Sequence, residues 1–214
     1  MKLLLARHGN TFSPDMTPVF VGARNDLPLV PEGYRQAERF AKWIQSHFLA
    51  ENQNTKLAAV YCGPLKRTRQ FAQQVIQSLK LDLSPIIDER LNELDYGAWS
   101  GKTNEQVMSQ FGEEALKGWN DLSSWPDGCN WGSSPIEIAR EVGSFVDDLV
   151  RNHKNDETIL AVSSNGRLRY FLQLIPGCFE EKALDKSLKV SPGNACEIEI
   201  EASGIKLISW NRSP

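Results

Sequence analysis

The sequence predicts an α/β fold in which helices cover both faces of a mainly parallel sheet. Short continuous apolar runs, typical of strands buried on both faces, occur at residues 3–6, 57–61 and 158–162. Each run is followed by a loop and then by a segment with helical periodicity. This β-α-β-α order favours parallel strands joined by right-handed crossovers.

Four helices follow from periodicity and from start signals. The first two are predicted within residues 31–50 and after Pro64, because apolar residues recur there every three or four positions. Residues 134–137, Ser-Pro-Ile-Glu, combine a capping residue, a proline at the first helical position and a glutamate at the third. They open a third helix that runs to about Arg151. A fourth helix is predicted over residues 166–174.

The remaining segments complete a predicted single domain over residues 1–214. Two β-like runs at 196–201 and 205–210 predict a closing hairpin. Residues 103–133 fit neither period, so we interpret them as an insertion over the rim of the sheet. The insertion carries Trp119, Trp125 and Trp131. These rings either form a specificity lid or only pack a segment with little helix or strand of its own.

Composition excludes several classes of protein. The chain has 214 residues and a formal net charge of −3, which lacks the basic excess of a general nucleic-acid binder. The apolar run at residues 1–6 is too short for a signal peptide, and no stretch is long enough to cross a bilayer. We therefore expect no membrane association and a cytoplasmic location. The cysteines are scattered along the sequence and are expected to be reduced thiols, which agrees with a cytoplasmic location. They are Cys62, Cys129, Cys178 and Cys196.

Polar residues follow the predicted strands at the places where ligands bind in an open α/β sheet, outside the carboxyl ends of the strands. They occupy residues 7–11, 63–67, 90–93 and 163–166. One rim therefore collects an imidazole, guanidinium groups, a carboxyl group, hydroxyls and glycines. This combination predicts a ligand site at that rim.

The guanidinium groups predict a phosphate pocket. Arg7 and Arg67, converging on one point, supply the bidentate donors that phosphoryl oxygens require. Gly9 allows an anion to approach the backbone closely, and a helix start after Ser164 adds amide donors. Arginines here give the charge stabilisation that magnesium gives elsewhere, so neither a metal nor another cofactor is expected.

The chemistry of the pocket centres on His8 and Glu93. The imidazole is placed to attack phosphorus and carry the phosphoryl group covalently, which divides a slow displacement into two easier steps. Glu93 protonates the departing oxygen and later activates water. Two alternatives remain for Glu93, because it also fits a residue that caps a turn or an ion-pair partner of Arg90. Arg167 and Arg169 fit either the pocket or a solvated helix face and stay outside the predicted site.

These motifs resemble the histidine phosphatase superfamily in its phosphoglycerate mutase-like branch. The matching segments follow the family order from Lys2 to about Arg169: residues 5–11, 61–70 and 90–101, with Gly33 and the Gln36-Ala37 pair. The resemblance implies a three-layer α/β sandwich. It also implies that His8 becomes phosphorylated, that Arg7 and Arg67 grip the phosphate, and that Glu93 is the proton donor. Asn10 and Thr11 would line the same pocket.

One position departs from the family pattern. Where the family has Ser-His-Gly after a strand, this chain has Ser163-Ser164-Asn165-Gly166. A neutral hydroxyl, aided by Asn165, then replaces a charged imidazole donor, and such a loss typically costs about 100- to 1,000-fold in rate. Ser164 also fits a simple helix cap, and both readings hold together. His47 and His153 match no motif.

The sequence therefore predicts a metal-independent phosphomonoesterase that acts on a small phosphorylated metabolite, with activity reduced or altered by Ser164. The first alternative is a degenerate relative that binds a phosphorylated ligand or partner without efficient turnover. The second is phosphoglycerate mutase-type phosphoryl transfer. The short insertion without a basic cluster favours hydrolysis over mutase activity. The sequence fixes neither the substrate nor the oligomeric state.

Overall fold

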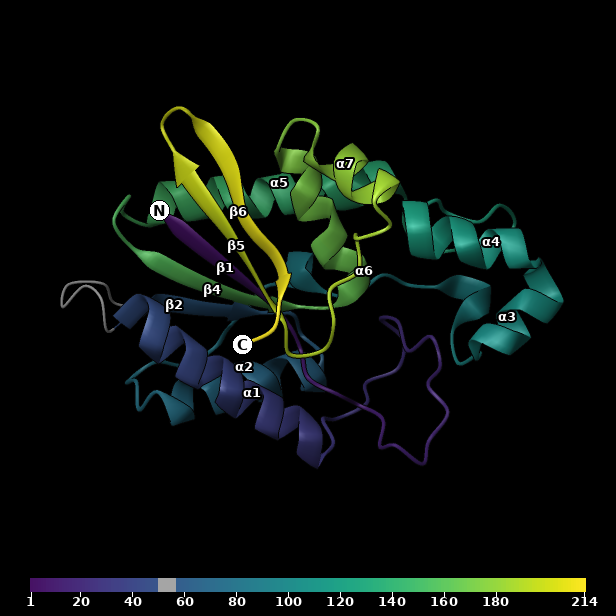
Figure 1. Cartoon of the computed structure of the whole chain (residues 1–214), viewed down its shortest axis with the longest axis horizontal. Coiled ribbons are helices and arrows are strands. Elements are labelled where there is room, and N and C mark those ends of the chain that lie inside the picture. Colours follow the sequence, from purple (N-terminus) through teal and green to yellow (C-terminus); the bar gives the residue numbers. More distant parts are fainter. Residues whose placement is uncertain (50–56) are drawn as a thin grey trace.

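The computed structural model describes residues 1–49 and 57–214 (Figure 1). A six-stranded sheet has the order β3-β2-β4-β1-β5-β6. The first four of these pair in parallel, whereas β5 pairs antiparallel with β1 and with β6. The mainly parallel sheet and the closing hairpin are confirmed. The strands are β1 (Lys2–Arg7), β2 (Leu57–Cys62), β3 (Ile86–Ile87), β4 (Thr158–Ser163), β5 (Ala195–Glu201) and β6 (Gly204–Arg212).

Helices cover both faces of the sheet, as the sequence predicts. In Figure 1, α1 (Pro31–Ile44) and α2 (Lys66–Ser78) lie on one face, and α5 (Pro135–Asn152) lies on the other. Strand β1 shows why both faces need a cover. Its side chains alternate, so that Leu3 and Leu5 enter the core under α5 while Leu4 and Ala6 enter the core under α1 and α2. The three layers hold the strand ends rigidly.

Several element boundaries differ from the prediction. Helix α1 ends at Ile44 and passes into a π-helical turn, Gln45–Leu49, while residue 50 lies outside the described residues. The predicted helix over 166–174 is divided into α6 (Asn165–Leu168) and a 3-10 helix, Arg169–Leu174. Helix α7 (Cys178–Leu184) was not predicted. Within the described ranges, no helix is both long and apolar enough to span a bilayer.

The insertion is more regular than its sequence suggests. The expectation that residues 103–133 have little secondary structure is wrong, because they include α3 (Asn104–Phe111) and α4 (Glu113–Lys117). A capping box starts α3: the Thr103 hydroxyl accepts from the Gln106 backbone N–H, and the Gln106 side chain accepts from the Thr103 N–H. This Thr-x-x-Gln signature in the sequence is the signal that indicates the start of α3. Figure 1 shows α3 and α4 at one end of the sheet.

Candidate active site

A cavity of about 1000 Å³ lies beyond the carboxyl end of β1. Its walls come from the loop after β1, from the start of α2, from the segment before α3 and from the insertion. The structure thus brings most of the predicted site residues together. Those that line the cavity are Arg7, His8, Asn10, Thr11, Arg67 and Glu93.

His8 follows β1 directly and is held by the backbone on both sides. Its N–H donates to the Ser163 carbonyl of β4, 3.0 Å away. The ring Nδ1 lies 2.8 Å from the carbonyl oxygen of Gly9. Because a carbonyl only accepts, Nδ1 carries the proton and Nε2 keeps its lone pair. The ring is only 6% exposed, so this tautomer is held at the cavity wall.

The surroundings of His8 favour the neutral ring. Burial lowers the pKa of His8 well below 6.5, and the guanidinium charges of Arg67 and Arg7 lower it further. A neutral imidazole is the nucleophilic form. The lowered pKa therefore favours the form of His8 that the predicted attack on phosphorus requires.

We expect nuclear magnetic resonance titration of the ¹⁵N-labelled protein to place the His8 midpoint well below pH 6.5. In the unfolded chain His8 takes up a proton near pH 6.5, whereas in the folded chain it takes one up only at lower pH. The unfolded state therefore binds more protons below pH 6.5, and the free energy of unfolding falls as the pH falls below 6.5. His47 and His153 provide separate signals in the same spectra. A His8 midpoint at or above 6.5 would contradict the packing described above.

The two predicted phosphate ligands are arginines fixed by carbonyl groups, of which Arg67 is buried and Arg7 is half-buried. Arg67 is 1% exposed and donates from Nη1 to Asn25 and from Nη2 to Gly22, both at 2.8 Å. Arg7 donates from Nη1 to the Val190 carbonyl at 2.7 Å, and its buried Nε has no partner among the described residues. Both guanidiniums keep donors beyond these contacts, since each carries five N–H groups.

Gly9 lies where the loop after β1 meets α1. A Cβ built at Gly9 would lie 2.5 Å from the Gly33 carbonyl oxygen, so the missing side chain lets the loop touch α1. The same helix orients Asn10. Its backbone N–H donates to Gln36 Oε1 at 2.7 Å, and Gln36 Nε2 donates to Asn10 Oδ1 at 3.2 Å. Gly9 therefore seats the loop on α1, and it also lines the cavity.

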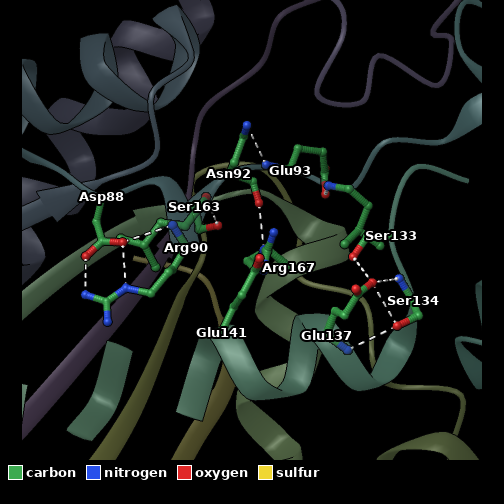
Figure 2. A network of polar contacts seen from close by, with 12 residues as sticks. Asp88, Arg90, Asn92, Glu93, Ser133, Ser134, Glu137, Glu141, Ser163 and Arg167 are labelled. Atoms are coloured by element: carbon green, nitrogen blue, oxygen red, sulfur yellow. Dashed lines mark hydrogen bonds and ion pairs between the residues drawn. The ribbon is translucent and has the colours of Figure 1, made fainter. Parts of the chain in front are cut away.

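Glu93 is held at the cavity by its own segment and by α6. Its Oε1 accepts from the Leu94 N–H at 2.9 Å. Figure 2 shows Arg167 beneath this segment, where Nε donates to the Asn92 carbonyl at 2.7 Å and Nη1 contacts Glu141 at 2.5 Å. Arg167 thus faces away from the cavity and supports the chain that carries Glu93.

The interpretation of Glu93 as an ion-pair partner of Arg90 does not fit the contacts. Arg90 pairs with Asp88 at 2.6 Å and with Asp148 at 2.5 Å. The Asp88 contact is drawn in Figure 2. Glu93 therefore faces the cavity without an ion pair to Arg90.

Tyr96 shares the wall with Glu93 and was not predicted as a site residue. A Cβ built at Gly166 would lie 2.5 Å from Glu93 Oε1 and 2.6 Å from the Tyr96 hydroxyl. Only glycine allows both groups to approach α6 this closely. Burial, followed by the charge of Glu93, raises the pKa of Tyr96 well above 10. Its hydroxyl therefore stays protonated and can donate.

Ser164 lies behind the cavity and does not line it. The side chain is fully buried at the start of α6, where it makes no capping hydrogen bond. Its Oγ has no hydrogen-bond partner within residues 1–49 and 57–214. The next residue, Asn165, does line the cavity, and its Oδ1 accepts from the Val190 N–H at 2.9 Å. Ser164 thus occupies the capping position at the start of α6, but its hydroxyl makes no capping hydrogen bond.

Arg169 lines the cavity although the sequence left it unassigned. It is 1% exposed and donates from Nη1 to the Trp119 carbonyl at 2.7 Å and to Ser123 Oγ at 2.8 Å. The sequence does contain a signal that Arg169 faces the cavity. Asn165 follows the β4 rim, and residues four apart share one face of a helix, so the fourth residue after Asn165 is directed to the same cavity.

The insertion tryptophans pack closely, and one of them also lines the cavity. Trp131 packs on Trp119 with ring centroids 4.8 Å apart, and Trp125 donates its indole N–H to the Tyr170 hydroxyl at 2.6 Å. These contacts are core packing. Trp119 also lines the cavity and lies 4.6 Å from the Arg169 guanidinium carbon. One of the three rings therefore reaches the site.

An imidazole with a free Nε2, set among buried guanidinium groups at strand ends, is the donor set of an enzyme that handles phosphoryl groups. No group of three or more metal-ligating side chains is placed to hold a metal ion in the part of the chain that the structure describes.

Comparison with known proteins gives the family. The family model of the histidine phosphatase superfamily (branch 1) matches residues 3–213. The chain therefore belongs to this superfamily, as its motifs suggest, and is an enzyme of the histidine phosphatase class.

Relatives include both mutases and phosphatases. A 2,3-bisphosphoglycerate-dependent phosphoglycerate mutase from Brucella anthropi is 27% identical over 188 residues, which cover 87% of this chain and 86% of the mutase. Phosphoserine phosphatase 1 from Hydrogenobacter thermophilus is 27% identical over 169 residues, covering 79% of this chain and 73% of the phosphatase.

Solved structures share the fold. A mycobacterial glucosyl-3-phosphoglycerate phosphatase superposes with a TM-score of 0.75 at 19% identity, covering 100% of this chain and 99% of that one. A phosphoserine phosphatase from Entamoeba histolytica, in complex with 3-phosphoglyceric acid, gives 0.71 at 22% identity, covering 98% and 96%. The three-layer α/β architecture is thus that of this superfamily.

Proposed function

We propose that the protein is a metal-independent phosphomonoesterase that acts on a small phosphorylated metabolite through a phosphohistidine at His8. The observation that supports this most is the tautomer of His8. The Gly9 carbonyl accepts from Nδ1, which leaves the Nε2 lone pair at a cavity wall shared with Arg7 and Arg67. Those guanidiniums would bind the phosphoryl oxygens, with Asn10 and Thr11 beside them.

The proposed reaction has two displacements. Nε2 of His8 attacks phosphorus, the bond from phosphorus to the ester oxygen breaks, and Glu93 gives its proton to that oxygen. In the second step water attacks the phosphohistidine, Glu93 takes the proton from that water, and the bond from phosphorus to Nε2 breaks. Inorganic phosphate leaves, and His8 and Glu93 return to their starting states.

Hydrolysis of an aryl phosphate in the presence of a chelator tests the proposal. Quenching at alkaline pH should capture phosphate on the wild-type protein, because a phosphohistidine survives base and is lost in acid. Mass spectrometry should then place the phosphate on His8. Turnover without any capture of phosphate on His8 during rapid quenching would argue for direct attack by water instead.

A second candidate function is a binding protein with little turnover. One observation favours it: the chain has three histidines, and only His8 lines the cavity. His47 contacts the Trp43 carbonyl, and His153 contacts Tyr61 and Glu157. We propose that Ser164 takes the place of the family's second histidine and that its buried Oγ, which does not line the cavity, gives the phosphoryl group no donor equal to an imidazole.

We expect Ser164→His to raise kcat for an aryl phosphate by about 10-fold or more, because one preorganised donor to developing charge is worth about 100- to 1,000-fold. Steady-state kinetics of the two proteins check this, with Ser163→Thr as a control beside the same strand end. An unchanged or lower kcat in a folded Ser164→His protein would mean that the hydroxyl is not the limiting defect. Phosphate binding without measurable wild-type turnover would favour the binding protein.

We further propose that residues 1–214 act as a single domain in the cytoplasm, without a nucleic-acid or membrane ligand. The sheet supports the first point, because β1 pairs directly with β5 from the other end of the chain. The free state of all four cysteines is consistent with a reducing compartment. Hydrolysis is favoured over mutase-type transfer by the short insertion, which carries no basic cluster.

A further inference from the structure

The cavity holds more positive charge than the phosphoryl site needs. Five cationic side chains and three carboxylates line it, and of these Lys186 already lies 3.5 Å from Asp121. In the described ranges 1–49 and 57–214, no ion pair involves Arg7, Arg67, Arg169 or Lys189. Buried cations without partners are costly, so the cavity favours a ligand with more than one negative group.

Arg169 is built into the wall as a fixed donor. Its Nη1 is anchored by the Trp119 carbonyl and Ser123 Oγ, and its guanidinium lies over the Trp119 ring. Its buried Nε has no partner among the described residues. A guanidinium held in one orientation, with a donor left over, loses little entropy when it binds an oxyanion.

Arg169 is held by a different part of the chain from Arg67. The insertion anchors its guanidinium through the Trp119 carbonyl and Ser123, whereas Arg67 is anchored by carbonyls of the segment before α1. Glu93 Oε1 packs against α6 at Gly166, three residues before Arg169. Arg169 therefore lies close to the proposed acid for the leaving oxygen, on the side where the leaving group is expected.

Lys189 adds a second cation to that side. It is exposed at the cavity rim, and burial of its stem together with the charges of Arg7 and Arg169 lowers its pKa. A flexible ammonium beside a fixed guanidinium suits an oxyanion that arrives from solvent.

We propose that Arg169 and Lys189 form a subsite for a second anionic group, a carboxylate or a phosphate, carried by the leaving group of the substrate. This inference rests on the proposed hydrolysis at His8 and names the class of substrate for it. The cavity volume of about 1000 Å³ accommodates such a metabolite with both groups bound.

Binding of phosphonates, which cannot be hydrolysed, tests the subsite directly. Isothermal titration would compare phosphonocarboxylates of one to three methylenes with alkyl phosphonates of the same lengths. We expect at least one carboxylate to bind the wild type about 10-fold or more tightly than its alkyl counterpart. Arg169→Met should abolish this gain and Lys189→Met should reduce it, whereas Lys117→Met, an exposed lysine away from the cavity, should leave it unchanged.

Two results would overturn the inference. One is equal affinity for the carboxylate and alkyl series in the wild type. The other is an equal loss for both series in Arg169→Met, which would place Arg169 on the phosphoryl group. Because Arg169 is buried, the thermal unfolding midpoint of the Arg169→Met protein is measured in parallel. Lys189→Met provides a substitution at an exposed position that does not threaten folding.

Hydrolysis of phenyl phosphate by the same proteins separates the two proposals. Wild-type turnover without a carboxylate gain would leave the phosphatase standing and remove the subsite. A carboxylate gain that depends on Arg169 and Lys189, with no turnover of phenyl phosphate or of carboxyphenyl phosphate, would keep the subsite and remove the phosphatase.

Discussion

His8→Ala is expected to lower kcat for an aryl phosphate by about 10⁴- to 10⁶-fold, the scale found when a nucleophile is removed from an enzyme that forms a covalent intermediate. The variant loses the atom proposed to receive the phosphoryl group, and the guanidiniums of Arg7 and Arg67 remain. Phosphate affinity should therefore change much less than turnover. Steady-state kinetics and titration with inorganic phosphate measure the two effects separately.

His47→Ala provides the matched control, because His47 is exposed in the turn after α1, does not line the cavity, and makes hydrogen bonds to Trp43, Ser46 and Arg212. It should keep the wild-type kcat. If His8→Ala retained more than about a tenth of the activity while folded, the covalent route through His8 would be wrong.

Glu93→Gln is expected to lower kcat by about 10²- to 10⁴-fold for alkyl phosphates, the usual contribution of a general acid. An alkoxide is a poor leaving group and needs the proton, whereas a nitrophenolate leaves without one. The loss should therefore shrink steeply along a series from alkyl to nitrophenyl esters. Rates for the ester series with both proteins give the dependence on leaving-group pKa.

Glu89→Gln is the control for this series, since Glu89 is an exposed carboxylate four residues earlier that does not line the cavity. It should leave every rate unchanged. A Glu93→Gln loss of the same size for all esters would assign Glu93 to binding or to the second step, and would remove it as the acid for the leaving oxygen.

The sequence predicted the elements that carry a strong buried pattern. Strands β1, β2 and β4 are continuous apolar runs, and α1 and α5 have wide apolar faces, so their periodicity is unambiguous. Helix α7 has no buried residue, and α3 and α4 bury only Val107 and Leu116. Helices with so few buried residues show no apolar periodicity that the sequence would reveal. The Thr103 capping box was the remaining signal for α3.

The site was predictable where residues follow strands directly. His8, Arg67 and Glu93 lie at the cavity because the carboxyl ends of parallel strands meet at one edge. Arg169 follows β4 by six residues, as Glu93 follows β3, but its direction depends on how residues 165–174 and the insertion pack. Lys189 follows no strand at short range. Ser164 shows the reverse case: a motif position predicted contact with the ligand, and packing buries its side chain behind the wall.

The anchoring of Arg169 by Trp119 separates two properties of the molecule. The tautomer of His8 is set by the adjacent residue's own carbonyl, within the loop after β1. The direction of the Arg169 guanidinium is set instead by Trp119, which belongs to the insertion. If Arg169 binds the leaving group as proposed, changes in the insertion would alter which esters are accepted while the His8 ring keeps its orientation. Selectivity could then change during evolution without a change in the proposed chemistry.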